Sequence, residues 1–382
     1  MTDLPTVLSR SQRLVVADGA GAPWTIVRNV SSNAGNTDGA SGEIFVGWCL
    51  GDGLKDVLPG PNLRFRSFMG GNGTRHMSSS EHFSYVPIRF SHLPRALATW
   101  MRPYTLVVAA VPVDNGWRLG TEAGWIPAAI ESASDVVVCA NRRIPDTTAV
   151  PTLSIESAAT IETDDAPEEF LTPAIDDVSA RIAEHVIELL PEDAAIQYGP
   201  GPIGAACVSM LRRPTRIRSG IVSDVVVDAI RRGKVIGKPV GAYAVGSHAF
   251  YDAINGLEWV DRVERTHDHA SLCRDNFFAI NTALEIDMSG QVNVESIKGS
   301  TVAGLGGHAD FAFAAASSRH GLSIIALPST RGSNATLVEH LGERVTTQRS
   351  DIDVVVTERG SVDLRGLSDS ERRIALSRLW GL

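Results

Sequence analysis

The cluster His267-Asp268-His269 brings two imidazoles and a carboxylate together within three residues. An imidazole titrates near neutral pH and can act as a general base, and a neighbouring carboxylate can orient it. The same residue types also suit a solvated loop or the ends of helices. We therefore treat His267 and Asp268 as candidate catalytic residues, by hypothesis.

Three glycine-rich turns could present backbone N–H groups to an anion or an oxyanion. They are Gly19-Ala20-Gly21, Gly199-Pro200-Gly201-Pro202-Ile203-Gly204 and Gly304-Leu305-Gly306-Gly307. None has the spacing of a P-loop. The second matches G-x-G-x-x-G, but Pro200 and Pro202 each remove an N–H that a dinucleotide pyrophosphate would need. The candidate donors are Gly199, Gly201, Gly204, Gly304, Gly306 and Gly307.

The segments that must hold these groups alternate between strands and helices. β-Branched and apolar runs predict buried strands over 14–17, 106–113, 136–140 and 195–198. Helices are predicted over 24–30, 125–132 and 175–190, and in a segment that ends at 210. This order is typical of α/β proteins with mostly parallel sheets.

The second half of the chain repeats the first in outline. Gly199 and Gly201 follow Gly19 and Gly21 at an offset of 180 residues, each pair after a strand. We expect two related open α/β domains over 1–160 and 174–382, with two unrelated halves as the alternative. Acidic residues, serine, threonine and proline predict a linker over 161–173.

Composition limits the class of protein. The 382 residues carry 35 Lys+Arg and 44 Asp+Glu, so the net charge is −9, and no long basic block suits nucleic acid. The longest apolar runs are far shorter than a membrane span. The four cysteines lie far apart without zinc-site spacing, so no metal is expected. With no signal-peptide pattern, we expect a cytoplasmic protein.

Several motifs in order resemble the acetyl-CoA hydrolase/transferase family of class I CoA-transferases. They are the runs at 280–292, 304–311 (GLGGHADF), 323–330 and 355–366. The resemblance implies two α/β domains with the active site between them, coenzyme A as part of an acyl-CoA substrate, and a homo-oligomer, with a hetero-oligomer left open. It also implies that a glutamate attacks the thioester, and that a glutamyl-CoA thioester follows a mixed anhydride.

The sequence departs from the family pattern at the position of this glutamate. The family segment resembles T/S-E-x-x-S-D-x-x-x-D-x-x-x-x-G, and here it reads 219–233 with Gly220 at the glutamate position. Near His267, relatives tend to carry an asparagine. A glycine has no side chain that could take an acyl group.

Three functions remain open at this point. The first is an acyl-CoA hydrolase that uses water, cutting either the thioester or a carbon–carbon bond of a cyclic keto acyl-CoA. The second is an acyl-CoA:carboxylate CoA-transferase whose carboxylate comes from another position. The third is a CoA-binding subunit without catalysis.

Overall fold

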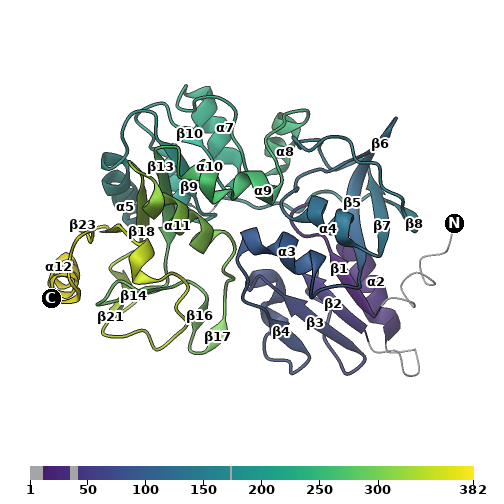
Figure 1. Ribbon diagram of the computed structural model, residues 1–382, viewed down its shortest axis with the longest axis horizontal. Helices are drawn as coiled ribbons and strands as arrows, with labels where there is room; N and C mark the ends of the chain where they lie inside the picture. The colour runs from purple at the N-terminus through teal and green to yellow at the C-terminus, as the bar shows by residue number, and fades with distance from the viewer. Residues whose placement is uncertain (1–11, 35–41, 173) are drawn as a thin grey trace. The chain divides into compact units, whose positions relative to one another are not determined.

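Two mostly parallel sheets organise the described part of the chain, residues 12–34, 42–172 and 174–382 of a computed structural model (Figure 1). They belong to two compact units. The first holds the described parts of Met1–Phe170 together with Ala242–Glu264 and Thr301–Gly306. The second holds the described parts of Leu171–Gly241 together with Arg265–Ser300 and Gly307–Leu382. Each unit is discontinuous in sequence, and the contiguous domain boundaries remain a prediction.

The sheet of the first unit runs in the order β4-β3-β2-β1-β5-β7-β8, and its neighbouring strands along this path are parallel. The hairpin strand β6 pairs antiparallel with β5. The strands are β1 (Arg13–Val16), β2 (Gly42–Val46), β3 (Leu63–Ser67), β4 (Phe83–Tyr85), β5 (Thr105–Val113), β6 (Gly116–Arg118), β7 (Asp135–Asn141), β8 (Ala159–Thr163) and β12 (Tyr243–Ala244). The helices are α2 (Trp24–Ala34), η1 (Asn72–Met77), η2 (Phe90–His92), α3 (Leu93–Ala98), α4 (Ile126–Ser132) and α8 (His248–Ile254).

Alternation along the strands decides which residues of this sheet meet helix α2. Val16, Val107 and Val137 point to one face, where they share a buried cluster with Ile26 and Val27 of α2. Successive residues of a strand face opposite sides. The valines between these positions therefore point to the opposite face of the sheet. Both faces are apolar, which explains the near-continuous apolar runs of β5 and β7.

The segment expected to be a linker differs from the prediction at its start. Residues 161–163 complete β8, which pairs parallel with β7. Further along, the Glu168 N–H donates to the Ala20 carbonyl oxygen at 2.8 Å. An edge strand needs only one apolar face, so its sequence, with two threonines and a glutamate among five residues, does not resemble a buried strand.

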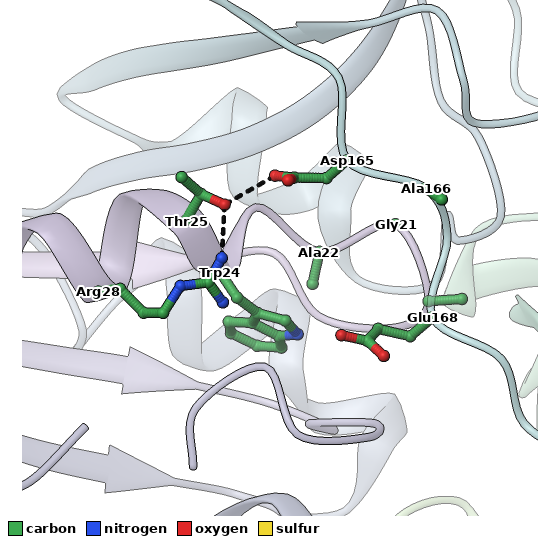
Figure 2. A pocket seen from close by; sticks show the side chains of 9 residues that line it. Gly21, Ala22, Trp24, Thr25, Arg28, Asp165, Ala166 and Glu168 are labelled. Carbon is green, nitrogen blue, oxygen red and sulfur yellow. Dashed lines mark hydrogen bonds between the residues drawn. The ribbon is translucent and has the colours of Figure 1, made fainter. Parts of the chain in front are cut away.

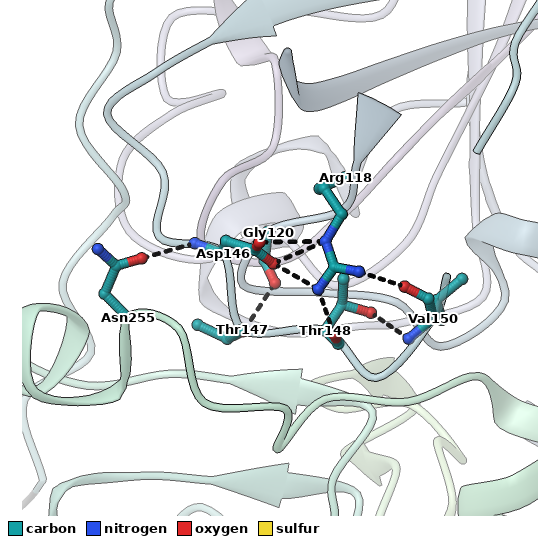
Figure 3. Close-up of polar contacts among 7 residues, drawn as sticks. All are labelled: Arg118, Gly120, Asp146, Thr147, Thr148, Val150 and Asn255. Carbon is teal, nitrogen blue, oxygen red and sulfur yellow. Dashed lines mark hydrogen bonds and ion pairs between the residues drawn. The ribbon is translucent and has the colours of Figure 1, made fainter. Parts of the chain in front are cut away.

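An arginine ties the segment after β7 to β6 within the first unit (Figure 3). Arg118 contacts the Asp146 carboxylate through Nε at 3.1 Å and Nη2 at 3.0 Å, and Nη2 also donates to the Thr148 carbonyl oxygen at 2.8 Å. The Asp146 N–H donates to Asn255 Oδ1 at 3.0 Å. A two-pronged arginine contact of this kind fixes geometry as well as charge.

The sheet of the second unit runs β10-β9-β13-β18-β22-β23, parallel except for the last pair. Its strands are β9 (Ala195–Tyr198), β10 (Arg216–Ile217), β13 (Phe277–Thr282), β18 (Leu322–Ala326), β22 (Val354–Thr357) and β23 (Gly360–Asp363). Shorter strands are β11 (Ile221–Val222), β14 (Glu285–Asp287), β15 (Val292–Asn293), β16 (Ser296–Ile297), β19 (Thr330–Arg331), β20 (Asn334–Ala335) and β21 (Leu337–Val338). The helices are α5 (Asp177–Glu188), α6 (Pro202–Ser209), α7 (Asp224–Arg231), α10 (His269–Leu272), α11 (His308–Ser317), η3 (Arg349–Asp351) and α12 (Asp369–Trp380). The boundary between the units crosses α9 (Val263–Thr266) and β17 (Ser300–Thr301).

Helix α11 is held on the second sheet by alternate residues of β13. Phe277 and Ala279 pack in one buried cluster with Phe311 and Ala314. At the carboxyl end of β13, Asn281 Nδ2 donates to the His308 carbonyl oxygen at 3.3 Å. The packing therefore places the first turn of α11 at the strand ends where ligands of parallel α/β sheets bind. Among the described residues, no helix is long and apolar enough to span a bilayer.

Candidate functional site

Three separate loops of the second unit meet at the imidazole of His267. Gly220 follows β10, His267 precedes α10, and Gly307 precedes α11. A β-carbon built on Gly307 would lie 2.3 Å from His267 Nε2, so only glycine fits there. A β-carbon on Gly220 would lie 3.9 Å from the same nitrogen and 3.5 Å from Phe311 Cε2, which is ordinary contact. The Nε2 edge of the ring therefore lies next to both glycines.

The His267 ring is held in place on two sides. Its Nδ1 lies 2.8 Å from Thr266 Oγ1, and its centroid lies 4.4 Å from that of Phe311. Burial lowers the pKa of His267 to about 4, while the charge of Asp310 raises it and that of His269 lowers it. Because a buried imidazolium is costly, the ring is neutral at neutral pH. A neutral imidazole can accept a proton or donate an N–H to an oxygen.

Asp268 has a different position from the one its sequence neighbours suggested. Its carboxylate accepts from the Ala270 N–H at 3.1 Å and caps α10. The carboxylate that contacts an imidazole is Asp310, whose Oδ1 lies 3.2 Å from His269 Nε2. Asp310 is fully buried in the first turn of α11, where the helix dipole stabilises a negative charge. Asp310 comes from a distant segment, so spacing within 267–269 gave no signal for it.

His308 was absent from the predicted site and lies directly after Gly307. Its Nδ1 lies 2.9 Å from Thr347 Oγ1, which fixes the ring. Its Nε2 is buried and has no hydrogen-bond partner among the described residues, and burial lowers the pKa of His308 to about 4. A buried polar atom without a partner is uncommon and marks a place where a ligand or water would bind. The sequence feature that could have indicated His308 is its position in the motif GLGGHADF, directly after Gly307.

The predicted donor glycines do not all gather at His267. Gly199 and Gly201 form the turn between β9 and α6. Gly204 lies in the first turn of α6, where its β-carbon would lie 2.2 Å from the Gly199 carbonyl oxygen. No atom lies within 4 Å of a β-carbon built on Gly199 or on Gly201. Gly304 and Gly306 belong to the first unit. Within the second unit, Gly307 lies beside His267.

The turn Gly19-Ala20-Gly21 already binds a carboxyl group of the protein itself. Glu122 Oε2 accepts from the Gly21 N–H at 3.2 Å and from Thr121 Oγ1 at 2.5 Å. A β-carbon on Gly19 or Gly21 would lie 2.7 Å or 2.8 Å from a Glu122 carboxylate oxygen. Burial raises the pKa of Glu122 to about 7. The anion position predicted for this turn is thus occupied by an internal side chain.

Comparison with known proteins shows which family the chain is similar to. Residues 246–379 match the family model of the acetyl-CoA hydrolase/transferase C-terminal domain. Over 390 residues the chain is 28% identical to the 4-hydroxybutyrate coenzyme A transferase of Clostridium kluyveri, with 97% of this chain and 91% of that protein covered. The chain is thus similar to the acetyl-CoA hydrolase/transferase family, in its C-terminal domain by the family model and over nearly its whole length by this relative.

Further known proteins are similar to the chain in sequence or in fold. The chain is 25% identical over 316 residues to the acetyl-CoA hydrolase of Neurospora crassa, covering 68% of this chain and 59% of that protein. The crystal structure of RipA from Yersinia pestis superposes with a TM-score of 0.88 at 25% identity, covering 97% of this chain and 90% of that one. The predicted family and α/β fold are confirmed, and the protein is an enzyme that acts on acyl-CoA. Among the described residues, no three His, Cys, Asp or Glu side chains are arranged to hold a metal ion.

Proposed function

We propose that this enzyme hydrolyses an acyl-CoA with water as the acceptor. The observation that carries the proposal is the absence of a side chain at Gly220 beside the neutral, buried imidazole of His267. In the family, the side chain expected at this position is the glutamate that takes the acyl group. With that carboxylate missing, the space next to Nε2 suits a water molecule.

The reaction can be written with the groups at hand. His267 Nε2 takes a proton from water while the water oxygen bonds to the acyl carbonyl carbon. Backbone N–H groups at the start of α11 would stabilise the oxyanion, an effect worth roughly 3–4 kcal/mol per donor in other enzymes. The carbon–sulfur bond then breaks, and the proton passes from His267 to the thiolate of coenzyme A. The negative charge of Asp310 favours the transient imidazolium.

Attack by water could also cut a carbon–carbon bond. In a cyclic keto acyl-CoA, water adds to the ketone, the ring carbon leaves as a carbanion and takes the proton from His267. The thioester then survives. Assay of free thiol separates the two cases, because only thioester hydrolysis releases coenzyme A.

A second candidate, transfer of coenzyme A to a carboxylate, is supported by the relative that covers most of the chain, which is named a CoA transferase. It requires a carboxylate from a position other than 220. Borohydride trapping during turnover distinguishes the two, since only a transferase forms a glutamyl thioester. A trapped thioester in the native enzyme would refute the hydrolase proposal.

The substitution Gly220→Glu tests the missing side chain directly. Its β-carbon meets only ordinary contacts, at 3.5 Å and 3.9 Å. We expect the variant to gain carboxylate-dependent transfer of coenzyme A and a borohydride-trappable thioester, while hydrolysis falls, as followed by exchange of labelled acetate into acyl-CoA. Gly220→Gln is the matched control, because an amide has the same size and cannot form the anhydride. If Gly220→Glu transfers no more than Gly220→Gln, position 220 is not the family's glutamate position.

The assembly and location of the enzyme also remain proposals. We infer a homo-oligomer from the resemblance to the family, and a cytoplasmic location from the four widely spaced cysteines. Light scattering on the purified chain measures the oligomeric state, and cell fractionation measures the location.

A further inference from the structure

A pocket of about 120 Å³ opens in the first unit where α2 begins (Figure 2). Its walls are Ala20, Gly21, Ala22, Trp24, Thr25, Arg28, Asp165, Ala166 and Glu168. The volume corresponds to roughly four water molecules. The pocket is therefore too small for coenzyme A and suits a compound of a few heavy atoms.

The indole of Trp24 provides an unused hydrogen-bond donor on this pocket. The side chain is 3% exposed, and Nε1 is buried without a partner among the described residues. Buried N–H groups are almost always paired with protein, water or ligand. An oxygen atom inside the pocket would satisfy this one.

Glu168 provides a hydrogen-bond acceptor in the same pocket. Its backbone is fixed, because its N–H donates to the Ala20 carbonyl oxygen at 2.8 Å and its carbonyl oxygen accepts from Tyr251 Oη at 2.7 Å. Figure 2 shows the Glu168 carboxylate directed towards the indole ring of Trp24. Burial raises the pKa of Glu168, the charge of Asp52 raises it further, that of Arg28 lowers it, and that of Asp165 raises it.

The remaining polar side chains of the pocket contact one another. Thr25 Oγ1 donates to Asp165 Oδ2 at 2.9 Å and accepts from Arg28 Nη2 at 2.7 Å. Arg28 Nη1 donates to the Gly53 carbonyl oxygen at 2.8 Å. One guanidinium thus faces two carboxylates, so the pocket has one negative charge in excess. This charge excludes phosphates and carboxylates and attracts a monovalent cation.

We propose that this pocket binds a small primary ammonium compound that also carries a hydroxyl or carbonyl oxygen. The ammonium donates to the Glu168 carboxylate, and the oxygen accepts from Trp24 Nε1. A charge-assisted hydrogen bond supplies most of the affinity, and the indole N–H selects for the oxygen. The site is separate from the His267 cluster, and its occupancy does not depend on the acyl-CoA reaction.

Three probes of similar size test the proposal on the full-length protein. Ethanolamine, ethylene glycol and glycolate each carry a hydroxyl and differ in charge at the other end. The readout is the indole ¹⁵N–¹H resonance of Trp24, assigned by its loss in Trp24→Phe. We expect a saturable shift with protonated ethanolamine, at least tenfold weaker binding of ethylene glycol, and no shift with glycolate.

Variants then test the carboxylate. Glu168→Gln should weaken ethanolamine binding at least tenfold, whereas Glu162→Gln, at an exposed position of β8 outside the pocket, should leave it unchanged. Calorimetry repeats the comparison without relying on the tryptophan signal. Equal binding of ethanolamine by Glu168→Gln, an equal response to glycolate, or a shift that never saturates would each overturn the proposal and leave a water-filled pocket.

Discussion

At the scale of single residues, His267 is the group on which the proposed hydrolysis depends most. His267→Asn keeps a polar side chain of similar reach but removes the base, so we expect kcat to fall by roughly 10²–10⁴. The KM should change little, because the imidazole contacts the attacking water more than the ground-state substrate. Steady-state kinetics measure both. A loss confined to KM would show that His267 only binds substrate.

The pH dependence of the native enzyme follows from the same residue. The pKa of His267 is lowered to about 4, and a base must be deprotonated to act, so kcat/KM should be flat from about pH 5 to 8 and fall below about pH 4. Asp310 raises this pKa, so Asp310→Asn should move the acid limb to lower pH. An acid limb near pH 6.5 in both proteins would mean that an exposed histidine is the base.

At the scale of elements, the turn between β1 and α2 depends on the fit of Glu122 against its glycines. Gly21 has no unusual φ, but a β-carbon there would lie 2.8 Å from Glu122 Oε1. We expect Gly21→Ala to lower the free energy of unfolding by about 1–3 kcal/mol, through overpacking of a buried carboxyl group. Gly60→Ala is the control, since nothing lies within 4 Å of its β-carbon. Urea denaturation compares the two, and an equal effect would show that Glu122 moves freely.

The sequence predicts best those helices and strands whose apolar pattern lies within a few consecutive residues. Strand 195–198 was predicted with the bounds that β9 has, and the helix predicted over 175–190 contains α5, because an apolar pattern within a few residues fixes both. The edge strand β8 gave no such pattern. The pairing of His269 with Asp310 spans 41 residues and arises from packing of α10 on α11. No local sequence rule predicts this contact. By contrast, the glycine-rich motif did predict Gly307 as a candidate residue of the site.

At the scale of the whole molecule, burial shifts the pKa of two acids in the first unit and of two histidines in the second unit in opposite directions. Burial raises the pKa of Asp18 and Glu122 to about 7 and lowers that of His267 and His308 to about 4. Between about pH 4 and 7 the folded state retains carboxyl protons that the unfolded chain has released, so these acids make stability fall as pH rises. Between about pH 4 and 6.5 the unfolded chain binds imidazole protons that the folded state excludes, so the histidines make stability rise with pH.

These opposing slopes can be separated by substitution. Glu122→Gln removes one falling contribution, so the urea midpoint of the variant should increase more with pH between 5 and 7 than that of the native protein. His308→Asn removes one rising contribution, so its midpoint should increase less. The comparison of slopes within each variant is insensitive to a constant loss of stability, which either substitution could cause. If Glu122→Gln has the native slope, Glu122 is ionised throughout this range, and its contacts with Gly21 and Thr121 outweigh the cost of burying the charge.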